Sequence, residues 1–180
     1  MKTNWTTAQI YERNPGKWRR EYENEAKARL YNSTNFPLVR YSDVLLMKAE
    51  AENEVYNGPT AEAYEAINMV RRRAFGKPVD IADADADIPA NLTKDDFFVE
   101  LQNERLRELC FEGIRKHDLI RWGSYVFTMK NLAADITANA PSTWKYAASA
   151  GNNVTARNVL FPIPITELTI NDKIEQNEGY

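Results

Sequence analysis

The sequence predicts an all-α fold made of antiparallel helix pairs of the tetratricopeptide type, joined by long irregular loops. Apolar residues recur at three- and four-residue intervals in several segments, which is the spacing of one helix face. Glycine and proline follow these segments, and threonine or serine precedes some of them, as expected at helix ends. No segment of useful length alternates apolar and polar residues in the manner of a half-buried strand.

The first helix is predicted from about Ser42 to Asn57. Asp43 lies in its first turn, where a negative charge suits the helix dipole. Gly58 is expected to end the helix, and Pro59 can open the next one. Apolar residues spaced at i, i+3, i+7 and i+11 predict one buried face, made of Val44, Met47, Ala51 and Val55.

The second helix is predicted from about Pro59 to Phe75, and Gly76 and Pro78 should stop it. The break between the first two helices is so short that they must pack antiparallel. The small residues Ala49, Ala51, Ala63 and Ala66 would allow a close approach. The apolar stripe of the second helix is Ala63, Ile67, Val70 and Ala74.

Further helices follow a long acidic loop. Thr93 is expected to cap a third helix over residues 94–111, with Asp96 as its capping-box partner. After Gly113, a helical turn or two is predicted over 114–122. Ser124 then opens a fourth element with the stripe Tyr125, Met129, Leu132 and Ile136. We also expect a short helix within 21–30, a loop over 141–157 and one last turn over 166–171.

Composition bounds the class of protein. A chain of 180 residues with 43% apolar residues suits one globular domain, which we expect to span residues 1–180. The net charge of −3 gives little support for nucleic-acid binding. Cys110 is the only cysteine, and we interpret it as a small core residue. The absence of an apolar leader after Met1 would, taken alone, indicate a cytoplasmic protein.

The densest charged segment carries three carboxylates on one helix face. Glu104, Glu108 and Glu112 are spaced at i, i+4 and i+8, which is unfavourable unless cations oppose them. One interpretation is a carboxylate active site of the glycosidase type. We favour a partly buried network in which arginines pair bidentately with these glutamates and tie helices together. The available arginines are Arg40, Arg71, Arg73, Arg115 and Arg121.

Metal sites and cofactors find little support in the sequence. Asp83, Asp85 and Asp87 have the spacing that begins a calcium loop, but Ile88 and Lys94 stand where glycine and glutamate are needed. A solvated acidic loop over 80–87 is the better interpretation. His117 is the only histidine, and phosphate-binding and nucleophile motifs are missing. We therefore expect no metal, no cofactor and no catalysis.

Four segments together resemble the SusD/RagB family of outer-membrane nutrient-binding lipoproteins. Each is loose alone, but their order and spacing are specific, and they cover residues 37–180. A small departure is Glu178, where the family usually has proline. The segments are 37–51 (PLVRYSDVLLMKAEA), 66–74 (AINMVRRRA), 104–123 (ERLRELCFEGIRKHDLIRWG), and Pro162-Ile163-Pro164 with Glu167 and the final QNEGY.

The resemblance implies a helical surface lipoprotein that captures oligosaccharides or other nutrients and hands them to a SusC-like TonB-dependent transporter. It implies no enzymatic activity. Family members are longer and carry a signal peptide, a lipidated cysteine and further helical repeats in front. We therefore expect this chain to be the C-terminal part of such a protein, soluble as a fragment, with the parent on the cell surface. The alternative is a helical-repeat adaptor that binds other proteins in the cytoplasm.

Candidate ligand contacts come from chemistry, because the family motifs match core positions. Sugar rings stack on aromatic side chains, while amides and charged groups bind the hydroxyls. The aromatics outside the helical stripes are the candidates, although each tryptophan could instead cover the edge of a core. We expect Trp122 to be a core residue. The candidates are Trp5, Trp18, Tyr22, Trp144 and Tyr146.

Overall fold

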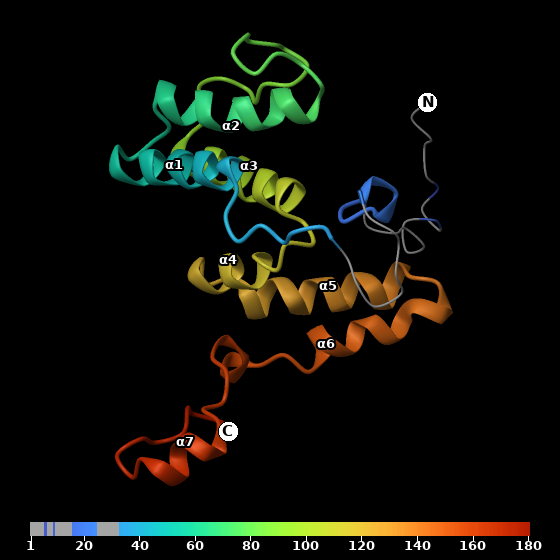
Figure 1. Ribbon diagram of the computed structural model, residues 1–180, viewed down its shortest axis with the longest axis vertical. Helices are drawn as coiled ribbons and strands as arrows, with labels where there is room; N and C mark the ends of the chain where they lie inside the picture. Colours follow the sequence, from blue (N-terminus) through green and yellow to red (C-terminus); the bar gives the residue numbers. More distant parts are fainter. Residues whose placement is uncertain (1–5, 7–8, 10–15, 25–32) are drawn as a thin grey trace. The chain divides into compact units, whose positions relative to one another are not determined.

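The computed structural model describes residues 6, 9, 16–24 and 33–180 (Figure 1). These residues form helices and no strand, and the all-α prediction is confirmed. The α-helices are α1 (Tyr41–Val55), α2 (Ala61–Ala74), α3 (Lys94–Glu108), α4 (Arg115–Arg121), α5 (Tyr125–Asn139), α6 (Ser149–Asn152) and α7 (Ile165–Ile170). Short 3-10 helices are η2 (Arg20–Tyr22), η3 (Ser142–Ala148) and η4 (Ala156–Val159).

The chain divides into two compact units. The first unit comprises residues 16–115, and the second comprises 1–15 with 116–180. The expectation of a single domain stays a prediction. Within the described residues, no helix has the length and apolar character needed to cross a bilayer.

The first unit is built on α1, which packs against both α2 and α3 (Figure 1). Thr60 Oγ1 caps α2 by accepting a hydrogen bond from the Ala63 amide, and Thr93 Oγ1 caps α3 in the same way. Caps of this kind fix where each helix begins. The core combines large and small side chains from the three helices: Leu46, Ala49, Ala63, Ile67, Val70, Phe97 and Leu101.

The buried face of α1 differs from the predicted one. Val44 and Met47 are each 44% exposed and Val55 is 74% exposed, so the predicted stripe lies on the surface. Leu46 and Ala49 are buried instead, together with the polar Asp43 and Asn53. Asp43 accepts a hydrogen bond from Arg105, and Asn53 donates one to the Lys94 carbonyl. Because α3 supplies partners to the Asp43 carboxylate and to the Asn53 Nδ2 group, polar residues occupy part of the buried face, and the prediction from apolar spacing alone was wrong.

The acidic loop after α2 is held down by buried polar groups of that helix. The Arg72 guanidinium makes two 2.7 Å hydrogen bonds to the Asp87 carboxylate. The same contact raises the pKa of Arg72 and lowers that of Asp87. Asn68 accepts from the Ile88 amide, and Lys77 pairs with Asp83. Lys77 Nζ also lies 3.8 Å from Asp85, so all three carboxylates considered for calcium face cations of the chain itself.

The end of α3 is earlier than predicted. The helix stops at Glu108, three residues before the expected end at Phe111. Phe111 has φ of 63°, in the left-handed region that a non-glycine residue rarely adopts. This reversal carries Glu112 away from the helical direction, so the i+8 spacing from Glu104 no longer describes its position.

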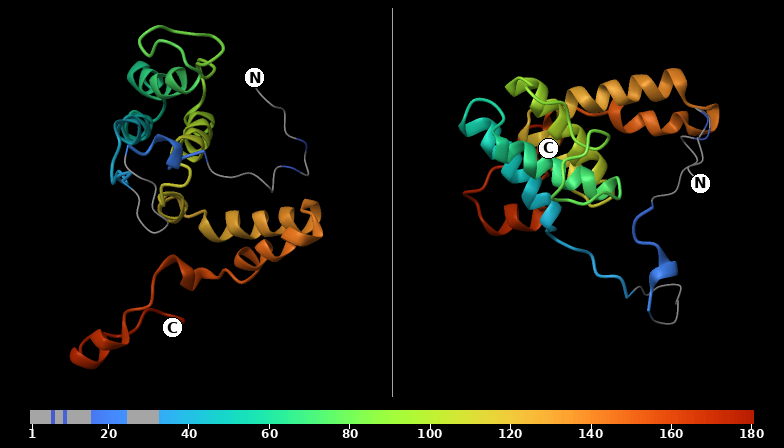
Figure 2. Two further views of the ribbon diagram at one scale, coloured as in Figure 1. Left: turned by 45° about the vertical axis from the view of Figure 1, so that its right-hand side comes forward. Right: turned by 90° about the horizontal axis from the view of Figure 1, so that it is seen from above.

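The second unit is centred on α5, which packs against η3 and α6 (Figures 1 and 2). The segment 141–157 was predicted as loop, but much of it is helical in η3, α6 and η4. Small side chains make this packing possible. A Cβ added at Gly151 would lie 2.0 Å from the Met129 carbonyl oxygen and 2.7 Å from Ala133 Cβ. The buried cluster is Ala133, Ile136, Ala140 and Ala148.

Candidate functional site

Glu112 is the most strongly engaged carboxylate of the charged segment. Its side chain is 4% exposed, and it accepts hydrogen bonds of 2.9 and 2.8 Å from Arg40 Nε and Nη2. Lys17 Nζ also pairs with it. Burial raises the pKa of the Glu112 carboxyl, but the hydrogen bonds from Arg40 and Lys17 outweigh burial and lower it overall. These contacts therefore favour the ionised form of Glu112.

The other two glutamates are also held by two cations each. Glu108 pairs with Arg40 at 2.8 Å and with Arg73 at 2.5 Å. Glu104 pairs with Arg71 at 3.1 Å and with Arg107 at 2.8 Å. Their side chains are 8% and 4% exposed. The structure therefore brings Arg40, Arg71 and Arg73 to the three glutamates, across three segments of the chain.

The remaining predicted network residues lie elsewhere. Arg115 Nη1 donates to the Gln102 carbonyl, and Arg121 Nε donates to Asp118 at 2.9 Å. Sequence reasoning missed Lys17, Arg107 and the buried pair Asp43–Arg105. Arg107 stands three residues after Glu104, a spacing that could have identified it. The pair Lys17–Glu112 joins residues 95 positions apart and leaves no local signal.

The ion pairs bear on the alternative of a carboxylate active site. A glycosidase needs one carboxylic acid whose pKa is raised so that it stays protonated. The pKa of Glu112 is shifted in the opposite direction. Glu104 and Glu108 each accept hydrogen bonds from arginines of α2. The arrangement is thus suited to holding segments together.

A cleft lined largely by charged residues opens beside the network within the first unit. We call it the Trp18 cleft, and its volume is about 470 Å³. The Trp18 indole stacks on Phe36 with ring centroids 5.1 Å apart, and its Nε1 donates to the Phe111 carbonyl. Trp18 has φ of 60°, a backbone conformation that costs energy. The cleft is lined by Lys17, Trp18, Asn35, Pro37, Arg40, Arg73, Arg107, Glu108 and Glu112.

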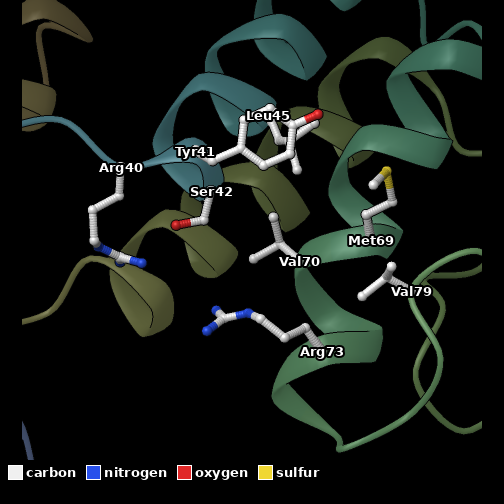
Figure 3. Close-up of a pocket in the computed structure, with 8 residues that line it drawn as sticks. All are labelled: Arg40, Tyr41, Ser42, Leu45, Met69, Val70, Arg73 and Val79. Atoms are coloured by element: carbon white, nitrogen blue, oxygen red, sulfur yellow. The ribbon is translucent and has the colours of Figure 1, made fainter.

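An apolar hollow of about 310 Å³ shares two residues with that cleft, Arg40 and Arg73 (Figure 3). In this view the two guanidinium groups lie on one side of the hollow, while Met69 and Val79 lie on the other. The walls come from α1, α2 and the loop that follows α2. The two arginines thus line both the Trp18 cleft and the apolar hollow.

In the second unit the structure brings Trp144 and Tyr146 together on η3. Their ring centroids lie 6.1 Å apart with an angle of 30° between the planes. Trp144 packs against the small-residue core and is half-buried, so it also covers a core edge. The Tyr146 side chain is 68% exposed. The pair therefore presents a supported aromatic surface to solvent.

The other aromatic candidates have different settings. Tyr22 is 73% exposed, with the Arg19 guanidinium 5.8 Å from its ring centroid. Trp5 lies outside the described residues. Trp122 is half-buried beside the Arg121 guanidinium, in place of the full burial expected for a core residue.

Comparison with known proteins identifies relatives of the chain. The sequence profile of the SusD family matches residues 2–180. The SusD-like protein P25 of Formosa agariphila is 33% identical over 167 residues, which is 91% of this chain and 28% of that protein. The starch-binding protein SusD of Bacteroides thetaiotaomicron is 31% identical over 153 residues, or 83% of this chain and 22% of SusD.

A solved structure agrees with the fold. The crystal structure of a SusD homolog from Bacteroides thetaiotaomicron superposes with a TM-score of 0.72 at 39% identity, over 79% of this chain and 26% of that one. The chain thus spans about a quarter of the length of these relatives.

Proposed function

This chain belongs to the SusD family of binding proteins, and we propose on that basis that it contributes to glycan capture at the cell surface. In this proposal the whole protein is an outer-membrane lipoprotein without enzymatic activity. It passes its ligand to a SusC-like TonB-dependent transporter. One relative is named as a starch-binding protein, which supports an oligosaccharide as the ligand class.

The observation that carries the proposal is the Trp144–Tyr146 pair. Two aromatic rings inclined by only 30° offer neighbouring apolar faces on which sugar rings can stack. Trp144 is fixed by its packing against the core, so little conformational freedom is lost when a ligand binds. The exposed amides of Asn152 and Asn153 follow on the next helix and its end. Amide groups of this kind both donate to and accept from hydroxyls.

Calorimetric titration of the 180-residue chain with neutral oligosaccharides, chosen from a glycan array, tests this site. We expect Trp144→Ala and Tyr146→Ala each to weaken binding by roughly tenfold, if each ring contributes about 1.4 kcal/mol. Tyr56→Ala is the matched control, because Tyr56 is 66% exposed on the first unit. Binding that survives both replacements, or that Tyr56→Ala weakens equally, would contradict this site.

Delivery to a transporter needs a separate test. We expect the full-length protein to co-purify from outer membranes with a TonB-dependent transporter. We also expect deletion of its gene to abolish growth on the captured glycan. Normal growth on that glycan without the gene would contradict the delivery role while leaving glycan binding intact.

A second candidate function rests on the outer face of α1. Val44, Met47 and Val55 expose apolar side chains along one helix face, which is a feature of protein-interaction surfaces. A helical-repeat adaptor would use such a face. If Val44→Ser with Met47→Ser abolishes capture of a defined protein partner while glycan binding is unchanged, the adaptor function gains support.

A further inference from the structure

The charges of the network are unequally distributed between its interior and the Trp18 cleft. Five basic side chains serve three glutamates: Lys17, Arg40, Arg71, Arg73 and Arg107. All three carboxylates are nine-tenths buried or more, whereas Arg73 and Arg107 are 53% and 52% exposed. The solvent in the cleft therefore meets cations, in a chain whose net charge is −3.

The arginines fall into two classes. Arg40 and Arg71 are 26% and 16% exposed, and each also donates to a backbone carbonyl, that of Glu108 or of Ala86. These two arginines hold segments together. Arg73 and Arg107 are second partners of glutamates that Arg40 and Arg71 already neutralise.

Arg73 and Arg107 retain unused donor capacity. A guanidinium has five N–H donors in a planar fork that suits oxyanions. Arg73 uses Nη2 on Glu108, and Arg107 uses Nε and Nη2 on Glu104. The Nη1 groups of both arginines therefore have no hydrogen-bond partner among the described residues, and both residues line the cleft.

An aromatic wall stands in the same cleft. Phe36 stacks on the Trp18 ring, and the Trp18 Nε1 is held by the Phe111 carbonyl. This fixes the indole at the edge of the cationic cleft. Asn35 adds an amide to the lining, which can bind hydroxyls. An apolar ring surface, an amide and two half-exposed guanidinium groups match a sugar that carries an acidic group.

We propose that the Trp18 cleft binds an anionic sugar, with its carboxylate or sulfate at Arg73 and Arg107 and its ring against Trp18. The inference deepens the proposed function, on which it rests, by assigning a substrate class to a second site. Each arginine contributes charge-assisted hydrogen bonds, which are stronger than neutral ones. Lys17, Arg40 and Arg71 remain as cationic partners of the three glutamates when a ligand occupies the two outer arginines.

The test compares three oligosaccharides by titration into the full 180-residue chain: maltotetraose, tetragalacturonate and a κ-carrageenan tetrasaccharide. We expect the carboxylated or the sulfated probe to bind and to weaken as salt rises, because salt screens exposed charges. Arg73→Gln and Arg107→Gln should each reduce its affinity by about tenfold. Trp18→Ala should also reduce the affinity for the anionic probe, but inorganic sulfate should still compete with that probe as well as it does in the parent.

Two controls keep the result interpretable. Lys48→Gln removes one positive charge from an exposed pair with Glu62 and should leave every affinity unchanged. Thermal melts should show Arg73→Gln and Arg107→Gln folded, because each glutamate keeps its more buried arginine. Comparing the titrations of the two anionic probes then identifies the recognised group. If only one probe binds, its acidic group, carboxylate or sulfate, is the one that the cleft recognises.

Several outcomes would overturn the inference. One is that an anionic probe binds with the same affinity to the parent, Arg73→Gln and Arg107→Gln. Another is that inorganic sulfate displaces the probe completely while Trp18→Ala leaves the affinity for the probe unchanged. If maltotetraose or another neutral glycan binds through Trp144 and Tyr146 while neither anionic probe binds, the inference fails and the proposed function stands. If no glycan of any charge binds the chain, both fail.

Discussion

The interiors of the two units are stabilised by different kinds of contact. The first unit buries charged groups between helices, with Asp43–Arg105 and the glutamates of the network paired in its interior. The second unit brings α5 and α6 together through alanines and Gly151. The first interior depends on paired charges, and the second depends on small side chains that let its helices approach closely. The stability of the first unit should therefore fall when a charged side chain is removed, and that of the second when a side chain is enlarged.

The largest effect is expected from Arg40→Ala in the first unit. This change removes a mostly buried partner from the buried carboxylates of Glu108 and Glu112 at once, and leaving a buried charge without its partner costs about 3–5 kcal/mol. Arg73→Ala is the matched comparison, because Arg73 also pairs with Glu108 but is half-exposed. It should cost about 0–1 kcal/mol. Urea unfolding followed by circular dichroism measures both, and equal costs would show that burial does not distinguish the two arginines.

An intermediate effect is expected from Gly151→Ala in the second unit. The added Cβ would meet the Met129 carbonyl at 2.0 Å, and overpacking of this kind costs about 1–3 kcal/mol. The gain in helix propensity, up to about 1 kcal/mol, opposes this cost only in part. Gly16→Ala is the control, because no atom lies within 4 Å of its Cβ position. A melting temperature for Gly151→Ala at or above that of the parent would show that α5 and α6 separate easily.

The smallest effect concerns acid. The pKa of Glu112 is lowered from its ordinary value of 4.5, so its ion pairs stabilise the fold above that pH and are lost as the pH falls below it. We expect the melting temperature of the parent chain to fall between roughly pH 5 and 3. Glu112→Gln should start from a lower melting temperature and fall less steeply. Parallel curves for the two proteins would assign the acid loss to other groups, Asp87 among them.

The difference between the units also explains which predictions succeeded. Helix existence could be predicted because it depends on local signals, such as Thr93 before α3 and Gly76 after α2. The buried face of α1 could not, because Asp43 and Asn53 are buried by partners on α3 that are 62 and 41 residues away. Helical structure over 141–157 was missed because its segments are short and lack apolar stripes.

The candidate sites divide in the same way. The glutamate spacing pointed to arginine partners, and Arg40, Arg71 and Arg73 do contact those carboxylates. Nothing local could show that Lys17 joins them, or that Phe111 turns the chain so that Glu112 meets Arg40. The aromatic residues were selected by type alone, and their ligand contacts remain predictions.

The long reach of the Arg40–Glu112 pair has a consequence for the order of folding. The α1–α2 hairpin closes a short loop, whereas this pair joins residues 72 positions apart and Lys17–Glu112 joins residues 95 apart. Closing a longer loop costs more chain entropy, so local contacts are expected to form first. The ion pairs of the network are then expected to form after the transition state for folding, so that they mainly slow unfolding. In a chevron plot, Arg40→Ala should accelerate the unfolding limb far more than it slows the refolding limb.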